Sequence, residues 1–469
     1  MTIKLYNTAI GKKEIFKPIK EGQVGIYSCG PTVYWNQHIG HMYAYILWDV
    51  LVRFLRTNGF TVKWVMNITD VGHLTSDGDS GDDKMEKGAA RENLTPWQVA
   101  EKYTKQFLES LKLLNVQQPD VLPRATEHIK EQIQLAQQIE KNGFAYKTST
   151  GLVFDTGKFK DYAKFANLKL DEQAAGARVE IDRQKKNPWD FLLWVTNQPN
   201  HIMQWDSPWG KGFPGWHIEC TAMSTKYLGE KFDIHTGGIE HIKVHHTNEI
   251  AQAHGAFGQK QVNYWLHNGW LTLKGRKMSK SKGNMLLITD LLAAGFSPMH
   301  FRYLVLTSHY RKGLVYEPAA LAGAKIAYDR LVSMMQNWRQ QPGEREINQE
   351  KLAKLEEIRN NFNQSLSDDL NTAKALAVVW GLAKSNLPSR DKLELIEEFD
   401  RVLGLQLVNL AKAKPVSVPL KVKKLAQDRK TCRQKGEYDQ ADQLRQKIDR
   451  LGWYLEDLPG NDYLLKPKE

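Results

Sequence analysis

Two short motifs, far apart in the chain, carry side chains suited to binding a polyphosphate. The first, His38-Ile39-Gly40-His41, lies where an expected strand ends and an expected helix begins. A helix N-terminus offers unpaired backbone donors and a positive dipole end, which favour phosphate, and Gly40 leaves room for a flat base. The second, Lys277-Met278-Ser279-Lys280-Ser281, could clamp phosphate oxygens with its lysines and hydroxyls. Taken alone, the first motif is more typical of a capped helix with surface histidines, and the second is compatible with a solvated basic loop.

A third group of residues has the ligand types that zinc prefers in proteins. Cys29 follows the first expected strand, and Cys220 lies on an expected helix that begins near Trp216. His245 and Glu249 are four residues apart, so on a helix they share one face. Two thiolates, an imidazole and a carboxylate suit zinc by ligand type. The long separation of the two cysteines is also compatible with two buried cysteines that bind no metal.

A parallel sheet can bring these residues together. Residues 25–29 form a short apolar run that ends at Gly30-Pro31, and residues 39–57 carry apolar side chains at helical spacing. Residues 61–68 are rich in β-branched and aromatic side chains, which predicts a second strand. Strand, helix and strand in one short unit imply a parallel sheet with a right-handed crossover. On such a core, the two phosphate-binding motifs in this order are much stronger evidence than either motif alone.

The rest of the chain divides into segments of different character. Residues 76–92 are polar and glycine-rich, which predicts a surface loop. Residues 150–199 have the pattern of an inserted piece with short strands. The other expected elements are helices over 95–115 and 127–142, strands at 232–235 and 264–273, helices over 319–405, a linker with two prolines at 411–420 and a basic tail over 421–469.

Length and composition limit the class of protein. A chain of 469 residues is too long for one core, so a large domain with smaller appendages is expected. The 3 cysteines are far apart, which excludes a disulfide framework and suits the reducing cytoplasm. Residues 1–20 contain no apolar run, so we expect no signal peptide and no membrane span. A net charge of +12 is as compatible with a nucleic-acid partner as with simple solubility.

Together these motifs resemble those of the cysteinyl-tRNA synthetase family, which belongs to class I of the aminoacyl-tRNA synthetases. The resemblance covers nearly the whole chain, and the motifs occur in the family's order. They are Cys29-Gly-Pro-Thr-Val-Tyr34, His38-Ile-Gly-His41, Pro123-Arg-Ala-Thr126, Gly176-Ala-Arg-Val179, Gly215-Trp-His-Ile-Glu-Cys220, His245-His246 with Asn248-Glu249, Lys277-Met-Ser-Lys-Ser281 and Asp368-Asp-Leu-Asn-Thr372.

The resemblance implies an α/β fold with a Rossmann-like parallel-sheet catalytic domain, an inserted connective domain, a helical bundle and a small C-terminal anticodon-binding domain. We therefore predict a catalytic domain in two halves with the insertion between them. The predicted boundaries are 1–124 for the first half, 125–205 for the insertion, 206–270 for the second half with the zinc ligands, 271–318 for the region of the Lys277–Ser281 loop, 319–410 for the bundle and 421–469 for the anticodon-binding domain.

The resemblance also implies roles for individual residues. One zinc ion per chain is expected to be bound by Cys29, Cys220, His245 and Glu249. ATP, with its magnesium, is expected to contact Gly40 and Lys280. We assign the charge that develops on the phosphates to His38 and His41, and the leaving pyrophosphate to Lys277 and Lys280. The residues expected to line the substrate pocket are Trp216, His235, Thr69 and Glu240.

The implied reaction joins L-cysteine to tRNA(Cys) in two steps. The cysteine carboxylate attacks the α-phosphate of ATP, which gives cysteinyl adenylate and pyrophosphate. A terminal ribose hydroxyl of the tRNA then accepts the cysteinyl group. Because the attacking carboxylate is already ionised, catalysis requires positioning and charge stabilisation instead of a protein nucleophile. Zinc would separate cysteine from serine, because it binds a thiolate far better than a hydroxyl.

Several positions depart from the family's pattern. Gly72-His73 replaces an acidic pair, Phe213 replaces a common Arg, and Thr247 replaces a Glu. Residues 236–240, Thr-Gly-Gly-Ile-Glu, replace a run similar to Gly-Gly-Gly-Ser-Asp, and Lys243-Val244 replaces Phe-Pro. No zinc ligand and no signature lysine is lost, so these changes concern the outer contacts to the substrate.

Two other functions share parts of this pattern. One is the paralogous ligase of mycothiol synthesis, which joins cysteine to an amino sugar and should lack an anticodon-binding tail. The other is a non-catalytic RNA-binding module, which would not need His38, His41, Lys277 and Lys280. The basic tail favours tRNA as the partner, because seven cations between residues 421 and 435 suit RNA phosphates. In that tail, Trp453 either stacks on an anticodon base or anchors a small core.

Overall fold

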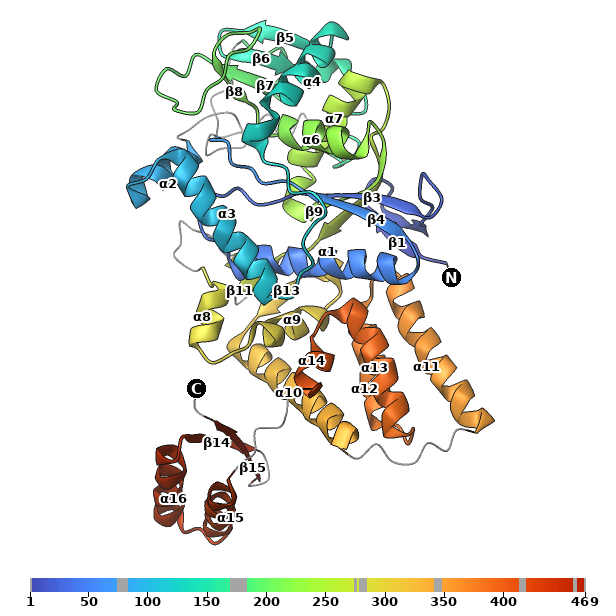
Figure 1. Cartoon of the computed structure of the whole chain (residues 1–469). Helices are drawn as coiled ribbons and strands as arrows, with labels where there is room; N and C mark the ends of the chain where they lie inside the picture. Colours follow the sequence, from blue (N-terminus) through green and yellow to red (C-terminus); the bar gives the residue numbers. More distant parts are fainter. Residues whose placement is uncertain are drawn as a thin grey trace. The chain divides into compact units, whose positions relative to one another are not determined.

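The computed structural model describes residues 2–73, 83–168, 184–273, 276–277, 285–340, 348–412, 419–458 and 462–467. The chain forms two compact units, Met1–Val408 and Asn409–Glu469. The first unit combines a parallel sheet, an antiparallel sheet and a group of long helices (Figure 1). Within the described ranges, no helix has both the length and the apolar character needed to cross a membrane.

A four-stranded parallel sheet forms the centre of the first unit. Its strands lie in the order β10 (Val262–Asn268), β9 (Phe232–Gly238), β3 (Gln23–Ser28) and β4 (Thr61–Met66). α1 (Ile39–Thr57) follows β3 and leads to β4, whereas α7 (His245–Phe257) follows β9 and leads to β10. The chain therefore leaves the two middle strands in opposite directions, which makes the gap between β3 and β9 a topological switch point. This sheet confirms the parallel α/β core expected from the sequence.

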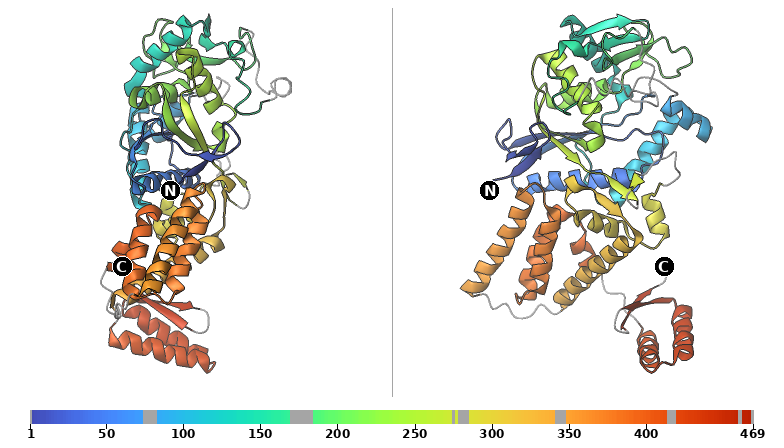
Figure 2. Two further views of the ribbon diagram at one scale, coloured as in Figure 1. Left: turned by 90° about the vertical axis from the view of Figure 1, so that its right-hand side faces the viewer. Right: turned by 180° about the vertical axis from the view of Figure 1, so that it is seen from behind.

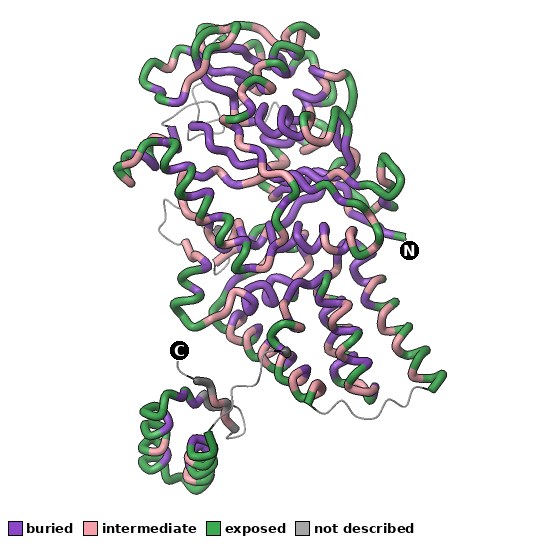
Figure 3. The backbone as a smooth tube through the Cα atoms, in the orientation of Figure 1, coloured by how far each residue is buried: buried purple, intermediate pink, exposed green. Residues whose placement is uncertain are grey.

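Helices cover both faces of the parallel sheet. α1 lies on one face, and α6 (Ile218–Leu228) lies with α7 on the other (Figure 1, Figure 2). The bounds of α1 match the sequence expectation, because its apolar stripe packs against the sheet and residues such as Ile46, Val50 and Phe54 are buried. Figure 3 shows buried residues concentrated in the strands and in α1, with exposed residues toward the periphery.

The inserted piece is an antiparallel sheet next to α4 (Ile129–Lys141). Its strands lie in the order β5 (Ala145–Thr148), β6 (Gly151–Phe154), β7 (Phe191–Thr196) and β8 (Gly212–Pro214). Phe154, Phe191 and Trp194 of this sheet pack with Leu135 and Ile139 of α4. The predicted short strands are therefore present, and a hydrophobic cluster that they share with α4, α6 and α7 stabilises them.

The segment before α3 (Pro96–Leu113) differs from the loop expected there. Residues 74–82 lie outside the described residues, but α2 (Lys84–Glu92) is a helix. Asp83 caps it by accepting a hydrogen bond from the backbone N–H of Glu86 at 2.6 Å. Gly88 is needed because a Cβ there would lie 3.0 Å from the carbonyl oxygen of Tyr34. Gly88, which contributed to the prediction of a loop, therefore lies in a helix where the backbone of Tyr34 comes close.

The remaining elements of the first unit connect the core to a helical region. β1 (Lys4–Asn7) and β2 (Lys12–Ile15) form a hairpin. β11 (Leu271–Leu273) pairs with β12 (Arg276–Lys277) and β13 (Leu314–Tyr316). The helices expected after residue 319 are α10 (Pro318–Gln340), α11 (Gln349–Ser367), α12 (Thr372–Lys384) and α13 (Ser389–Leu403), preceded by α8 (Ile288–Ala293) and α9 (Pro298–Leu306) and followed by α14 (Leu407–Lys412).

The C-terminal unit has a small core of its own. It contains α15 (Leu420–Gln434), α16 (Tyr438–Arg450) and a hairpin of β14 (Trp453–Leu458) and β15 (Asp462–Pro467). Trp453 is buried in this core with Val422, Ala426 and Ile448, so it anchors the unit and the stacking alternative is wrong. Arg429 is also buried, which removes it from the expected basic surface. The cations of α15 and its end that are exposed are Lys421, Lys423, Lys424 and Lys435.

A buried ion pair joins α1 to the helical region. The Arg302 side chain on α9 is fully buried, and its Nη2 lies 2.5 Å from Asp49 Oδ2 on α1. The same guanidinium donates to the carbonyl oxygens of Leu403, at the end of α13, and of Leu114, after α3. Three helices and a connecting loop therefore share hydrogen bonds with one buried cation.

Replacing Arg302 by Met should lower the free energy of unfolding of the first unit by about 3–5 kcal/mol, because the buried carbonyl oxygens of Leu403 and Leu114 would lose their donor and Asp49 would keep only Arg53 as a cationic partner. Lys13→Ala is the matched control, since the Lys13–Asp368 pair lies on the surface, with side chains 37% and 55% exposed. That control should change stability by less than about 1 kcal/mol. Urea unfolding followed by circular dichroism measures both, and equal effects of the two substitutions would contradict the assigned role.

Candidate active site

A cavity of about 430 Å³ opens at the carboxyl edge of the parallel sheet. Its wall includes residues that directly follow or end each of the four strands: Cys29 and Gly30 after β3, Asn67 and Thr69 after β4, Gly237 and Gly238 in β9, and Asn268 and Gly269 at β10. The N-terminus of α1 and the residue Trp216 before α6 complete it. This is the position in which open α/β sheets bind ligands, outside the strand ends at the switch point.

The four residues with zinc-ligand chemistry converge at this cavity. One ligand atom from each of Cys29, Cys220, His245 and Glu249 lies within 4.8 Å of the others. They come from the end of β3, from α6 and from the first two turns of α7. His245 Nε2 is 3.1 Å from Glu249 Oε1, as their spacing on one helix face predicts. Cys29, Cys220 and His245 face the cavity, whereas Glu249 lies behind them and is buried.

Electrostatics favour a cation at the centre of this cluster. Burial raises the pKa of the Cys29 thiol, and the hydrogen bond to Cys29 together with burial raises that of Cys220 well above its ordinary value. Burial alone would raise the pKa of Glu249, but His235 and His245 lower it to about 2. The two thiols resist ionisation in this buried place beside the ionised carboxylate of Glu249. A bound metal ion would supply the missing positive charge and deprotonate the coordinating thiols. The donor set therefore fits zinc.

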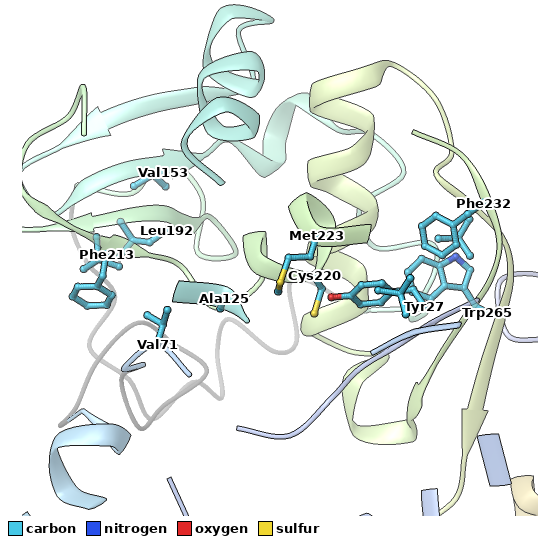
Figure 4. Packing of buried hydrophobic residues seen from close by; sticks show 13 residues of the cluster. Tyr27, Val71, Ala125, Val153, Leu192, Phe213, Cys220, Met223, Phe232 and Trp265 are labelled. Atoms are coloured by element: carbon cyan, nitrogen blue, oxygen red, sulfur yellow. The ribbon is translucent and has the colours of Figure 1, made fainter. Parts of the chain in front are cut away.

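Neighbouring side chains orient these four residues. His217 Nδ1 lies 2.9 Å from His245 Nδ1, which leaves His245 Nε2 directed at Glu249. The hydroxyl of Tyr27 points toward Cys220 in the hydrophobic cluster that also contains Met223 and Trp265 (Figure 4). Partners of this kind, behind the ligands, fix the tautomer and the rotamer that a metal requires.

A chain of hydrogen bonds runs from Thr8 through His267 on the edge strand β10 and His246 on α7 to Cys29. Thr8 Oγ1 lies 2.8 Å from His267 Nδ1, His267 Nε2 lies 2.7 Å from His246 Nδ1, and His246 Nε2 lies 3.2 Å from Cys29 Sγ. Burial lowers the pKa of both histidines, which keeps them neutral. If the Thr8 hydroxyl donates to His267, each imidazole receives one hydrogen bond and donates the next, so the last N–H points at the Cys29 sulfur.

His235 has a different position from the one expected. Its side chain is fully buried, stacks on Trp265 at a centroid distance of 4.6 Å and lies 2.9 Å from Glu249 Oε2 through Nε2. It therefore supports Glu249 from behind and does not line the cavity. Cys29, His235, His246 and Glu249 form a second convergent set. That set shares two residues with the first, but its two histidines have no surface on the cavity.

The remaining expected pocket residues lie at the cavity wall. Trp216 presents its ring between His73, His217 and His245, and Lys84 Nζ lies 4.1 Å from the ring centroid. The Thr69 hydroxyl donates to Glu219 Oε2 at 2.8 Å. Glu240 Oε2 accepts a hydrogen bond from Trp270 Nε1 at 2.7 Å.

The His38–His41 motif begins α1 at the cavity wall. His38 is the N-cap and accepts the Gly40 N–H at Nδ1, and the two histidine rings stack at 3.7 Å. Its use of Nδ1 as an acceptor leaves the proton of a neutral His38 on Nε2, where it can be donated to a ligand. Gly40 lines the same wall without a side chain.

Described residues on either side of the second motif can be related to the first motif. Residues 278–284, including Lys280, lie outside the described residues, and of Lys277 only the backbone, in β12, is described. On the other side of this loop, the carbonyl oxygen of Leu286 accepts a hydrogen bond from Ile39 N–H at 2.8 Å. The first residue of α1 is therefore hydrogen-bonded to a residue that follows the second motif closely in the sequence.

Comparison with known proteins identifies the family. Residues 15–326 match the class I (C) tRNA synthetase catalytic domain, and residues 361–386 match the DALR domain. Cysteine–tRNA ligase of Treponema denticola is 43% identical over 98% of this chain and 99% of its own length. The enzyme of Thermus thermophilus is 39% identical over 97% of this chain and 98% of its own. The chain belongs to the cysteine–tRNA ligase family.

This membership confirms the class I fold and the ligase activity expected from the motifs. A solved structure of Mycobacterium tuberculosis methionyl-tRNA synthetase, bound by methionyl-adenylate, covers 83% of this chain and 90% of its own with a TM-score of 0.58. At 16% identity that likeness shows the fold alone. The relatives match over the C-terminal unit as well, so the amino-sugar ligase without such a tail is not supported.

Sequence reasoning missed several residues of the site. His217, His246 and His267 were not proposed, although His217 and His246 lie next to predicted pocket and ligand residues. Tyr27 precedes Cys29 by two positions on β3, so strand alternation places both on one face. Alternation is thus the signal that could have found Tyr27, whereas the partners of the histidines follow only from the pairing of distant strands.

Cys220→Ser should remove the zinc from the purified protein, because an alcohol is a poor replacement for a thiolate ligand. Cys432→Ser is the matched control, since Cys432 lies in the C-terminal unit far along the chain from the cluster. Metal analysis by inductively coupled plasma mass spectrometry should find this zinc in the control and not in Cys220→Ser. Retention of the full zinc content by Cys220→Ser would contradict the ligand assignment.

Proposed function

We propose that this enzyme activates L-cysteine with ATP and transfers the cysteinyl group to tRNA(Cys). The main support is that Cys29, Cys220 and His245 converge in the wall of one cavity, and the N-terminus of α1 lines the same cavity. Thiol chemistry and phosphate chemistry therefore share one site. All three cysteines are free of disulfides, which suits action in the reducing cytoplasm.

Within this site, Cys29, Cys220, His245 and Glu249 would hold the zinc ion. We prefer this set to the one with His235 and His246, because three of its members face the cavity. Bound there, zinc supplies a Lewis acid that accepts the substrate thiolate and rejects the serine hydroxyl. His217 holds the ring of His245, and His235 holds the carboxylate of Glu249, so both act as positioning residues.

The adenine nucleotide would bind along the start of α1. Gly40 leaves the backbone accessible to the nucleotide, and His38 and His41 donate hydrogen bonds to the α-phosphate as its charge develops. Lys277 and Lys280 then neutralise the pyrophosphate, together with the magnesium that accompanies ATP. The hydrogen bond between Ile39 and Leu286 supports this assignment, because it places Leu286, which follows the lysine motif in the sequence, beside the start of α1.

The amino acid would lie between the thiol-binding wall and Trp216. Its ammonium group and side chain would then be enclosed by Trp216 and Thr69, and Glu240 orients Trp270, which also lines the cavity. The Thr69 hydroxyl donates its hydrogen bond to Glu219, so toward the substrate its oxygen would act as an acceptor.

We also propose that residues 421–469 bind the anticodon region of the tRNA. Lys421, Lys423 and Lys424 are exposed at the start of α15, where they can contact phosphates. Tyr438 and Tyr454 are 63% and 58% exposed, and they replace the buried Trp453 as candidates for stacking on an unpaired base.

Lys280→Ala should slow adenylate formation far more than it weakens cysteine binding, because its charge acts on the phosphates as they separate. Single-turnover formation of cysteinyl adenylate measures the step, and Lys13→Ala serves as a control cation on β2. We expect a loss of at least about a hundredfold for Lys280→Ala, from the typical value of one transition-state contact. An unchanged activation rate would refute the assigned role.

Deletion of residues 421–469 should leave cysteine-dependent ATP–pyrophosphate exchange nearly intact and cut tRNA charging sharply, because the cavity lies entirely in the first unit. Alanine at Lys421, Lys423 and Lys424 should flatten the salt dependence of tRNA binding, by about one unit of the logarithmic slope per lysine. Charging by the truncated enzyme at the rate of the full chain would show that the tail does not read the anticodon.

A further inference from the structure

A second group of metal-ligand side chains lies outside the cavity. Asp83 caps α2, Glu86 lies one turn later, and His201 comes from the loop between β7 and β8. One ligand atom from each lies within 4.8 Å of the others. None of these residues belongs to the zinc cluster or lines the cavity.

The distances suit a small ion with short bonds. His201 Nδ1 lies 3.4 Å from Asp83 Oδ2 and 3.7 Å from Glu86 Oε1. Donor atoms about 3.4 Å apart are what bonds of about 2.1 Å give in a tetrahedral site. The separations exceed those of good hydrogen bonds, so the three side chains do not satisfy one another.

Asp83 Oδ2 carries the strongest indication of a missing ligand. Asp83 is 5% exposed, and this oxygen has no hydrogen-bond partner although it is directed at His201. Its other oxygen is already used to cap α2. A buried carboxylate oxygen without a partner costs free energy unless a cation compensates it. Gly72 is part of the arrangement, because a Cβ at this position would overlap the carboxylate.

The protonation states match metal binding. Burial lowers the pKa of His201 to about 4, so its ring is neutral and offers a lone pair at neutral pH. Burial raises the pKa of Asp83 to about 6, which still leaves it mostly ionised at pH 7. A neutral imidazole and two carboxylates select against magnesium and calcium, which prefer oxygen ligands alone.

We propose that Asp83, Glu86 and His201 bind a divalent first-row transition-metal ion such as Zn²⁺. The ion joins the start of α2 to the loop that precedes β8, and so ties the antiparallel sheet to the segment after β4. Lys84, the next residue, places its ammonium group over the ring of Trp216 at the cavity wall. The ion therefore holds a contact of the substrate pocket in place from outside.

The test counts metal ions in full-length protein equilibrated with a small excess of Zn²⁺ and then desalted. Asp83→Asn with Glu86→Gln removes both charges, yet it preserves the cap of α2 and the acceptor that Ile202 N–H uses at 2.8 Å. Glu92→Gln, at the other end of α2, is the matched control. The wild type and the control should hold two ions, and the double variant and Cys220→Ser one each.

Cobalt substitution provides a second measurement, because the absorption spectrum of bound Co²⁺ reports its ligands. In wild-type protein, one Co²⁺ should show thiolate charge-transfer absorption and the other should show only weak ligand-field bands, because the second group lacks sulfur. Two ions with these spectra, and the loss of the second spectrum alone in the double variant, support the proposal. A single ion in the wild type, or two ions in the double variant, overturns it. Loss of the thiolate spectrum would instead count against the zinc cluster.

Discussion

The pairing of β3 with β9 is the constraint on which the site depends. Tyr27 lies opposite His235 and Ser28 opposite Thr236, although about two hundred residues separate them. The Cys29 N–H continues this ladder by donating to the Thr236 carbonyl oxygen at 3.1 Å. Because α1 leaves one of these strands and α7 follows the other, the pair brings the N-terminus of α1, with His38 and His41, and the start of α7, with His245 and Glu249, to the same edge.

A second constraint is the burial of charged side chains, which are stable only beside particular partners. Glu249 is fully enclosed, and only the histidines around it keep its charge favourable. The buried pair of Arg302 with Asp49 follows the same logic, since opposite charges and hydrogen-bond partners surround both groups, including Arg53 beside Asp49. In both places polar residues lie in the interior, and their hydrogen bonds specify one arrangement of helices. The cluster of Cys29, Cys220, His245 and Glu249 thus lies in a shell that allows its side chains little freedom to move.

Much of the fold could be predicted because its local signals agree with its tertiary environment. α1 was predicted with its bounds, since its apolar stripe is buried along the whole helix. α2 was not predicted, because a polar helix of 9 residues owes its stability to the cap at Asp83 and to the burial of Met85 and Ala89. Trp453 and Arg429 in the tail were also misplaced. The sequence pattern of an aromatic or basic residue is the same whether its side chain contacts RNA or packs in a small core.

The site shows the same division. The ligand types and the helical spacing of His245 and Glu249 indicated a metal centre, and the atoms converge as required. The place of His235 could not be predicted, because only the pairing of β9 with β10 puts its ring against Trp265. Its role moves from the pocket to the support of Glu249. Sequence patterns therefore identify the residues that do chemistry better than the residues that hold them.

We propose above all that one site recognises the substrate thiol and activates the carboxylate of the same amino acid. ATP–pyrophosphate exchange with cysteine and with serine, measured in parallel on the zinc-loaded enzyme, tests it most directly. The account predicts that kcat/KM for cysteine exceeds that for serine by about ten-thousandfold, which corresponds to about 5.5 kcal/mol. Exchange with serine at a comparable rate would contradict it, because shape alone separates two such similar side chains poorly.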